Sequence, residues 1–325
     1  MKKKVLITGA SGFVGYHLIQ VALERDLEVY AAVRTGSKID HLKSLPVIFT
    51  FPNLGNPIEL ENDFKEKQYD YIIHAAGTTK ANRKEDYDVV NAGYTRNLAL
   101  AVVNSGIRLQ KFLFISSLAA IGPALGTLEE EQLPNPISSY GKSKLLAESY
   151  LADFDLPSLI LRPTAVYGPR ERDILLMFKL ISQGLEFYIG RKDQQLSFIH
   201  VTDLANVTID LLKSLHVKKT YNLTDGNAYD RYALGNITKE VLGKKTLKLH
   251  VPLSLMKLTA GMLEMVYGIN GKIPTVNKEK LKELTAASWL YNTEDIKRDI
   301  DFSPTYDLHR GLKQTLQWYQ KHKWI

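Results

Sequence analysis

The sequence of 325 residues contains no cysteine. This absence excludes disulfide bonds, a cysteine nucleophile and thiolate metal sites, and it suits a reducing compartment, so we expect a cytoplasmic protein. The eight histidines show no spacing of the His-x-x-x-His kind, and we therefore assign no metal site. Internal repeats and low-complexity linkers are also absent, which is typical of an ordinary globular chain.

Long apolar runs are missing as well, and none approaches the length that crosses a membrane. The basic start Met1–Lys4 precedes only three apolar residues before a glycine turn, too few for a signal peptide. The most apolar stretch, residues 251–269, contains Lys257 and Glu264 and has helical spacing. We expect a helix that belongs to the core or covers a pocket, with docking on a membrane surface as the lesser alternative.

The net charge of +7 raises the question of nucleic-acid binding. However, the basic pairs are spread along the chain and are not interleaved with aromatic residues, as Arg191-Lys192, Lys218-Lys219 and Lys244-Lys245 illustrate. This pattern favours a solvated surface, with part of the positive charge available to an anionic cofactor. We expect a small-molecule substrate, no nucleic acid and no integral membrane segment.

Residues 1 to about 165 alternate short apolar segments, typical of strands, with segments of helical pattern. The predicted strands are Lys3–Thr8, Glu28–Val33, Val47–Phe51, Tyr69–His74, Lys111–Ser116 and Ser158–Arg162, and the predicted helices are Phe13–Arg25, Tyr87–Ser105 and Tyr140–Asp153. This alternation predicts an α/β fold with a doubly wound parallel sheet covered on both faces. Ligands of such sheets bind beyond the carboxyl ends of the strands.

Beyond Arg162 the pattern changes to short strands mixed with helices. We expect strands at Glu186–Ile189, Leu196–His200, Thr220–Leu223 and Thr246–Val251, and helices near Leu204–Ser214, Tyr232–Leu242, Leu253–Val266 and Leu308–Lys321. This arrangement predicts a smaller α/β substrate domain over the carboxyl edge of the sheet. The nucleotide-binding domain would take residues 1–165 and about 201–225, and the substrate domain residues 166–200 and 226–325.

A glycine turn follows the first predicted strand, in the sequence Thr8-Gly9-Ala10-Ser11-Gly12-Phe13-Val14-Gly15. Glycines between a strand and a helix let the backbone approach a diphosphate, and free N–H groups at the helix start favour its negative charge. A turn without any ligand is the alternative. The strand-turn-helix context favours a cofactor.

Arg34 stands 19 residues after Gly15, at the predicted end of the second strand. A carboxylate at this position would bind the ribose hydroxyls of NAD, whereas an arginine pairs with a 2′-phosphate and stacks on adenine. Ser11, Ser37 and Lys38 are the candidate helpers. The position therefore favours NADP(H), with NAD(H) as the alternative cofactor and an exposed loop arginine as the alternative without a function.

Tyr140 and Lys144 are four residues apart at the start of a predicted helix and therefore share one face. Ser117 precedes Tyr140 by 23 residues and follows a predicted strand. The ordinary pKa of a phenol, about 10, is too high for proton transfer at neutral pH, and a neighbouring ammonium and a positive nicotinamide would lower it. The three residues predict a site for a carbonyl or carbinol group beside a hydride carrier.

The motifs, taken together, resemble the extended short-chain dehydrogenase/reductase family, also called the NAD-dependent epimerase/dehydratase family. Those that carry the resemblance, besides the glycine turn and the Ser117, Tyr140 and Lys144 set, are Ile73–Gly77, Asn91, Leu161–Arg170, Phe198–Asp203 and Tyr221–Leu223. The resemblance spans nearly the whole chain. It implies a Rossmann-like cofactor domain, Ser117, Tyr140 and Lys144 as catalytic residues, and a homodimer formed through two helices of each subunit.

The resemblance also implies a larger set of ligand contacts. The cofactor contacts are assigned to Gly9, Ser11, Gly12, Phe13, Val14, Gly15, Arg34, Lys38, Asn53, Leu54, Ala75, Ala76, Gly77, Asn91, Ser116, Pro163 and Val166. The substrate contacts are assigned to Leu118, Ala119, Thr79, Tyr167, Arg170 and Arg191.

Departures from the family pattern narrow the expected activity. Dehydratases of this pattern carry an Asp-Glu pair after the catalytic Ser or Thr, where Leu118-Ala119 stands here, and many nucleotide-sugar enzymes carry an arginine at the position of Leu196. The C-terminal half looks most like 3β-hydroxysteroid-dehydrogenase-like and dihydroflavonol-reductase-like members. We therefore expect an NADP(H)-dependent oxidoreductase of a small, apolar alcohol or ketone. The alternatives are a nucleotide-sugar epimerase with tightly bound NAD and a non-catalytic cofactor-sensing module.

Overall fold

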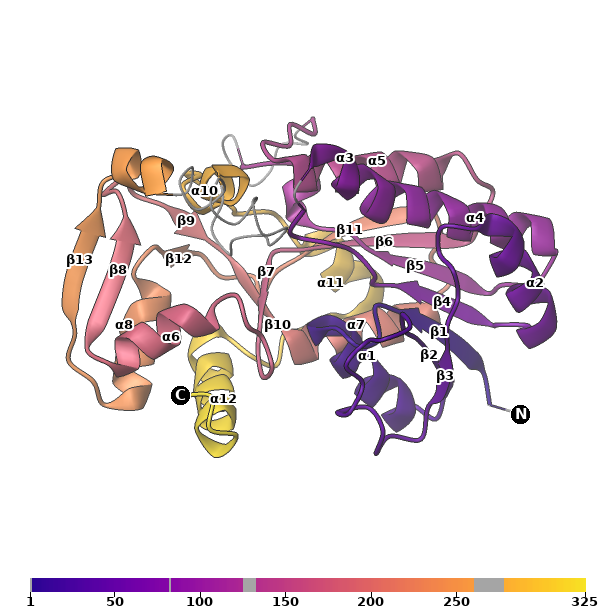
Figure 1. Cartoon of the computed structure of the whole chain (residues 1–325), viewed down its shortest axis with the longest axis horizontal. Helices are drawn as coiled ribbons and strands as arrows, with labels where there is room; N and C mark the ends of the chain where they lie inside the picture. Colours follow the sequence, from indigo (N-terminus) through magenta and orange to yellow (C-terminus); the bar gives the residue numbers. More distant parts are fainter. Residues whose placement is uncertain (1, 82, 125–132, 260–277) are drawn as a thin grey trace.

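The central sheet has seven parallel strands in the order β11-β6-β5-β4-β1-β2-β3 (Figure 1). The computed structural model describes residues 2–81, 83–124, 133–259 and 278–325. The strands of the sheet are β1 (Lys4–Thr8), β2 (Glu28–Ala32), β3 (Ile48–Thr50), β4 (Tyr71–His74), β5 (Lys111–Ile115), β6 (Ser158–Pro163) and β11 (Lys219–Leu223). Successive strands run outward from β1 in both directions, so the doubly wound, Rossmann-like fold expected from the sequence is confirmed.

Helices cover both faces of this sheet. One face carries α1 (Phe13–Glu24) and α7 (Val201–Leu212), and the other carries α2 (Pro57–Lys67), α4 (Tyr94–Ser105) and α5 (Ser139–Ala152). Along β1, Val5 and Ile7 enter the core on the first face and Leu6 enters the core on the second. Burial on both faces explains why the strands are continuously apolar rather than alternating.

Two local features differ from the expected pattern. Helix α2 was not expected, although Asn56 accepts the N–H groups of Ile58 and Glu59 and Pro57 occupies the first helical position, both of which are helix-start signals. The expected helix at 87–105 is divided into α3 (Lys84–Tyr87), the π-helix η1 (Asp88–Gly93) and α4. π-Helical turns often occur at functional sites.

The C-terminal part mixes short strands and helices, as expected. Its elements are β7 (Ala165–Tyr167), α6 (Leu175–Ser182), β8 (Leu185–Ile189), β9 (Gln195–Leu196), β10 (Phe198–His200), β12 (Tyr229–Asp230), α8 (Ala233–Leu242), β13 (Leu247–Val251), α10 (Lys278–Leu284), α11 (Glu294–Ile300) and α12 (Leu308–Lys321). The expected strand at 196–200 is divided into β9 and β10. Of the helix expected at 253–266, residues 253–259 are helical and the rest lies outside the described residues.

The parallel pair β7 and β10 joins the two parts of the molecule. Val166 and Ile199 are register partners and pack with the core beneath the central sheet. Tyr167 and Phe198, their neighbours in sequence, pack in the C-terminal core with α12. Because side chains alternate across a strand, this two-stranded sheet contributes one face to each core.

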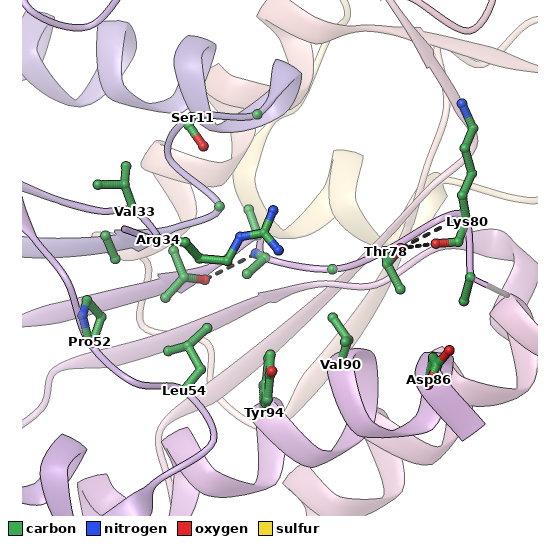
Figure 2. A pocket seen from close by; sticks show the side chains of 18 residues that line it. Ser11, Val33, Arg34, Pro52, Leu54, Thr78, Lys80, Asp86, Val90 and Tyr94 are labelled. Atoms are coloured by element: carbon green, nitrogen blue, oxygen red, sulfur yellow. Dashed lines mark hydrogen bonds between the residues drawn. The ribbon is translucent and has the colours of Figure 1, made fainter. Parts of the chain in front are cut away.

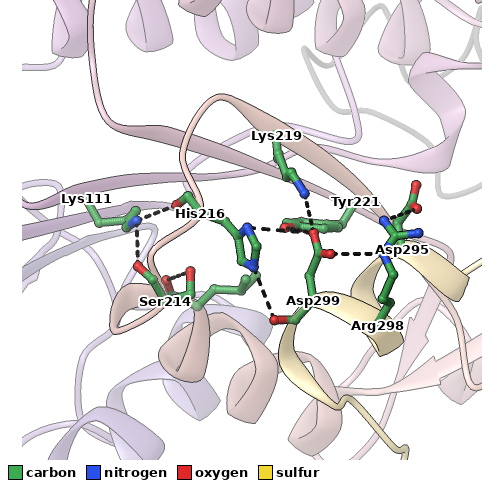
Figure 3. A network of polar contacts seen from close by, with 9 residues as sticks. Lys111, Ser214, His216, Lys219, Tyr221, Asp295, Arg298 and Asp299 are labelled. Carbon is green, nitrogen blue, oxygen red and sulfur yellow. Dashed lines mark hydrogen bonds and ion pairs between the residues drawn. The ribbon is translucent and has the colours of Figure 1, made fainter.

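Helix α11 returns from the C-terminal part to the central sheet. Ile296 is fully buried in the core beneath the sheet. Asp299 accepts hydrogen bonds from Lys219 at 2.5 Å and Tyr221 at 2.8 Å on β11 (Figure 3). These two donors hold the pKa of Asp299 at about 2. Part of the expected substrate domain therefore packs with the nucleotide-binding sheet.

We predict that Gly15→Ala destabilises the fold by about 1–3 kcal/mol, because a Cβ at this helical position would lie 2.2 Å from the Gly9 carbonyl oxygen. Gly93→Ala is the matched control. At Gly93 φ is −60° and the nearest atom to a Cβ is the Asp88 carbonyl oxygen at 3.7 Å. Alanine there should be neutral or stabilise by about 0.5–1 kcal/mol. Urea unfolding of both variants checks the difference, and equal stabilities would contradict the packing argument.

Candidate active site

A pocket of about 450 Å³ opens where β1, β2 and β4 end (Figure 2). It lies at the point where the strand order reverses, which is where doubly wound sheets bind ligands. Of the residues assigned to the cofactor, Gly9, Ser11, Gly12, Arg34, Leu54, Ala75, Ala76 and Gly77 line this pocket. The first, second and fourth strands thus supply one continuous wall.

The glycine turn brings the backbone close to its neighbours. Gly9 has φ +72°, and a Cβ on it would lie 2.7 Å from the Ala75 carbonyl oxygen, so only glycine fits. Helix α1 begins after Gly12 with no side-chain cap and no acidic residue in its first turn. Its first N–H groups are therefore available to an anion, which fits the diphosphate of a dinucleotide.

A chain of hydrogen bonds fixes the loop after β4. The Ala76 N–H donates to the Thr8 hydroxyl at 3.1 Å, which lies 2.7 Å from His74 Nδ1, and His74 Nε2 lies 3.1 Å from the Thr95 hydroxyl. Thr95 donates to the Asn91 carbonyl, so His74 Nε2 carries the proton and Nδ1 accepts from Thr8. Burial lowers the pKa of His74 to about 3, and the ring is neutral.

Asn91 lies behind the pocket on the π-helix η1. Its side chain accepts the Thr78 N–H at 2.7 Å and donates to the Thr78 carbonyl and to the Ser143 hydroxyl at 2.9 Å. Asn91 therefore connects the loop after β4 to helix α5. It holds the lining in place rather than forming the lining itself.

Arg34 occupies the position that the sequence predicts for it, directly after β2 and Val33. Figure 2 shows its side chain extending into the pocket, with Ser11 on one side and Leu54 on the other. Lys38 is exposed and does not line the pocket. Asn53 is also exposed, and its side-chain oxygen accepts the Gly55 N–H at 3.2 Å.

The start of α5 lies against the segment that follows β5. Ser138 caps the helix by accepting the Gly141 N–H at 3.0 Å. A Cβ on Gly141 would lie 2.2 Å from the Ala119 carbonyl oxygen, so the helix can approach this closely only with glycine there. This packing brings Tyr140 into a side-chain hydrogen bond with Ser117.

Burial raises the pKa of Tyr140, Glu283 adds to the rise, and the hydrogen bond with Ser117 opposes it. Lys144 Nζ donates to the Ile115 carbonyl at 2.8 Å and lies 4.7 Å from the centre of the Phe114 ring. Burial lowers the pKa of Lys144 to about 8. The sequence suggested that a neighbouring ammonium and a nicotinamide would lower the pKa of the phenol. In the protein by itself, the pKa of Tyr140 is raised instead.

Several other predicted residues lie away from the pocket. The Ser116 hydroxyl donates to Glu148, which is paired with Arg162. Tyr167 is buried in the C-terminal core, where its hydroxyl donates to the Asp307 carbonyl at 3.1 Å, so the structure does not bring it to a substrate. The predicted catalytic residues Ser117, Tyr140 and Lys144 do not line the pocket either, although a Cβ on Gly77, which does line it, would lie 3.3 Å from Lys144 Nζ. The other predicted residues that do not line the pocket are Phe13, Val14, Gly15, Pro163, Val166, Leu118, Ala119, Thr79, Arg170 and Arg191.

The surroundings of four of these residues are as follows. Leu118 and Ala119 are buried in a short 3-10 helix, η2 (Leu118–Ala120), that follows Ser117. Arg170 has φ +77°, and its guanidinium carbon lies 4.3 Å from the centre of the Tyr16 ring on α1. Arg191 is exposed.

One wall of the pocket, formed by the segment after β4 and the helices that follow, was not predicted from the sequence. Asp86, Val90 and Tyr94 line the pocket at four-residue spacing, a helical stripe that the sequence does contain. Lys80 also lines the pocket, and its ammonium lies 2.6 Å from Asp173 beyond β7. The spacing of the stripe could have identified three of these four residues.

Helix α10 reaches the start of α5 from far along the chain. The Ser138 hydroxyl donates to Glu283 at 2.5 Å, and the Ser139 N–H donates to Glu279 at 2.7 Å. Glu283 is also a cause of the raised pKa of Tyr140. No local sequence signal identifies these contacts, because more than a hundred residues separate the two helices.

Across the described ranges, no three His, Asp or Glu side chains gather as metal ligands do. Within the same ranges, no helix is both long enough and apolar enough to cross a membrane.

Comparison with known proteins gives both a family and relatives of differing activity. Residues 5–224 match the NAD dependent epimerase/dehydratase family. A ceramide reductase from Caulobacter vibrioides is 28% identical, with 99% of this chain and 96% of the relative covered. A UDP-glucose 4-epimerase from Vibrio cholerae is 27% identical, with 98% and 95% covered.

A solved structure shares the fold. The UDP-glucose 4-epimerase from Thermotoga maritima, crystallised with UDP-glucose, superposes with a TM-score of 0.82 at 18% identity, covering 98% of this chain and 99% of that chain. The family match, the order of the motifs and the Rossmann-like sheet agree. The chain belongs to the NAD dependent epimerase/dehydratase family, the extended short-chain dehydrogenases and reductases, and is an NAD(P)-dependent enzyme of that type.

Proposed function

We propose that the protein is an NADP(H)-dependent oxidoreductase that acts on an apolar alcohol or ketone. The observation that carries the cofactor preference is Arg34, which extends into the pocket from the end of β2 (Figure 2). A guanidinium here supplies a charge-assisted, bidentate contact to a 2′-phosphate. The one acidic residue among the lining residues of this pocket, Asp86, comes from α3 and not from β2.

The cofactor fits the residues that are present. The uncapped start of α1 and the close approach of Gly9 to Ala75 suit a diphosphate, and Arg34 suits the adenosine end. The bound nicotinamide would supply or accept the hydride. Gly77, which borders Lys144, leaves room for the ribose that Lys144 would bind.

Tyr140 would exchange the proton with the substrate oxygen, and Ser117 would hold that oxygen through its hydroxyl. Because burial raises the pKa of Tyr140, the phenol is protonated at neutral pH before the cofactor binds. A protonated phenol suits the reduction of a ketone, where Tyr140 donates its proton as the carbonyl oxygen gains charge. Lys144 would stabilise the phenolate that this transfer leaves behind.

The absence of residues that sugar-modifying members of the family carry supports an apolar substrate. Leu118 and Ala119 stand where dehydratases carry an acidic pair. Arg191 and Arg231 are the candidates to replace the arginine missing at Leu196. Arg191 is exposed, and the guanidinium of Arg231 donates to the carbonyl oxygens of Lys192 and Ile189. The ceramide reductase relative offers a precedent for a lipid substrate within the family.

A nucleotide-sugar epimerase is the second candidate, favoured by the relative from Vibrio cholerae, which matches almost the whole chain. An epimerase would retain NAD through purification and show no net change in nicotinamide absorbance during turnover. Calorimetric competition of UDP-sugars with the purified protein, together with its cofactor content, tests this alternative.

We predict that Arg34→Glu weakens NADPH binding by about 1.5–3 kcal/mol, because it replaces a charge-assisted contact with repulsion. NADH binding should change little. Lys43→Glu is the matched control, since Lys43 is exposed and pairs with Asp40 outside the pocket. Calorimetry with both cofactors gives the ratio of affinities, and an unchanged ratio in Arg34→Glu would refute the NADP(H) assignment.

Tyr140→Phe should abolish turnover while leaving NADPH affinity nearly unchanged, because it removes the exchangeable proton and keeps the ring. Tyr150→Phe, on the same helix, controls for the loss of a hydroxyl and should retain activity. Hydride transfer is measured by nicotinamide absorbance with a panel of apolar ketones. Turnover by Tyr140→Phe would contradict the proposal that Tyr140 transfers the proton.

Lys144 gives a pH test that needs no substrate. Its pKa of about 8 lies below the ordinary 10.5, so between these values the folded chain loses the proton that the unfolded chain keeps. Wild-type stability should therefore rise relative to Lys144→Met as pH rises through this window. Urea unfolding at neutral and alkaline pH measures the difference, with Lys142→Met as the exposed control on α5. A stability difference that does not change with pH would contradict the buried ammonium.

A further inference from the structure

The strands β8 and β13 form a two-stranded parallel sheet at the end of the molecule remote from the central sheet (Figure 1). Its register pairs Leu185 with Leu247, Phe187 with Leu249 and Ile189 with Val251. Paired residues share a face, and residues two apart along a strand share it too. One face of this small sheet therefore carries six apolar side chains, and the other carries Glu186, Tyr188, Lys248 and His250.

The polar face is the one that packs against the protein. Glu186 and Tyr188 are buried, and they lie against Gly235 of α8. Glu186 accepts from Lys239 at 2.9 Å and from Thr246 at 2.8 Å. These contacts fix the orientation of the sheet, because turning it over would remove a buried carboxylate from its partners.

Of the six residues on the apolar face, Phe187 and Leu247 are exposed, the other four are half-buried and none is buried. This face therefore points away from α8 and is open to solvent in the part of the chain that the structure describes. Leu247 is 61% exposed and Phe187 is 41% exposed. The helical segment 253–259, which follows β13, adds Leu255 at 49% and Leu258 at 56%. Exposed apolar side chains gathered on one small sheet and on the helical segment that follows it are typical of an interaction surface.

Positive charge accompanies this apolar surface. Residues 243–259 contain four lysines, at 244, 245, 248 and 257, and no acidic residue. All four are exposed, but Lys248 belongs to the opposite, polar face of the sheet, where its ammonium lies 4.2 Å from the centre of the Tyr232 ring. Leucines interleaved with lysines, without acids, match the two requirements of a surface that binds anionic lipid.

We propose that this surface, defined by Leu185, Phe187, Ile189, Leu247, Leu249 and Val251 with Leu255, Leu258, Lys244, Lys245 and Lys257, docks on an anionic lipid bilayer. We call it the docking face. The apolar side chains enter the boundary between headgroups and acyl chains, and the lysines contact lipid phosphates. A second copy of this chain is a poorer occupant, because a two-fold contact would bring two acid-free lysine clusters together.

Docking on a bilayer would also define the substrate class more narrowly, an inference that rests on the proposed function. An apolar alcohol or ketone that resides in a bilayer is scarce in water, and an enzyme held at the bilayer surface meets it at high local concentration. The substrate class is then an alcohol or ketone of a membrane lipid.

The full-length protein is tested by co-sedimentation with vesicles of phosphatidylcholine alone and of phosphatidylcholine with phosphatidylglycerol. We expect binding to the anionic vesicles that weakens as salt rises. Leu247→Gln combined with Leu255→Gln should lower the partition coefficient at least about tenfold, as should Lys244→Glu combined with Lys245→Glu. Leu215→Gln, at a position 97% exposed on the loop after α7, and Lys43→Glu are the matched controls and should bind as wild type.

Three results overturn docking: no binding to anionic vesicles, equal binding by all variants, or a dimer in sedimentation velocity that Leu247→Gln dissociates. The last would make the docking face a contact between copies. Tyr140→Phe should bind vesicles like wild type, which separates the two proposals. Vesicle binding without any reductase activity would refute the proposed function alone, and activity on soluble ketones without vesicle binding would refute docking alone.

Discussion

A neutral, buried histidine holds the walls of the pocket together. His74 lies where β4 ends, bonded on one side to Thr8 of β1 and on the other to Thr95 of α4. Because burial keeps its pKa near 3, the ring has one donor and one acceptor throughout the physiological range, and the direction of every hydrogen bond in the chain is fixed. Thr8 then has a free acceptor for the Ala76 N–H, and the loop beside Gly9 takes a single position.

The loop after β4 is also linked to the residues proposed as catalytic. Asn91 bonds the backbone of Thr78 and the hydroxyl of Ser143, one residue before Lys144. The loop after β4 and helix α5, which carries Tyr140 and Lys144, are therefore linked through one amide side chain. The lysine itself is held by the Ile115 carbonyl at the end of β5. Burial raises the pKa of Tyr140, so its phenol is neutral, and lowers the pKa of Lys144, so its positive charge is weakened.

The sequence predicted the fold well, because a parallel sheet buried on both faces requires continuous apolar strands that are easily recognised. It also predicted that Ser117 and Tyr140 would meet, since the family motif specifies the spacing. The prediction for Tyr167 failed because neighbouring residues of a strand point to opposite sides. Tyr167 follows Val166 in the sequence, yet the two side chains enter different cores. The contact of Glu283 with Ser138 could not be predicted from the sequence, because it depends on how two helices that are distant in the chain pack together.

The pair β7 and β10 has a mechanical consequence. A hinge between two lobes needs a connecting segment that belongs firmly to neither, but this two-stranded sheet is packed into both cores, and α11 adds a further return of the chain to β11. Rotating one lobe against the other would break both packings at once. Ligands are therefore expected to enter through local movement at the rim, where the ion pair between Lys80 and Asp173 is the exposed and easily broken contact.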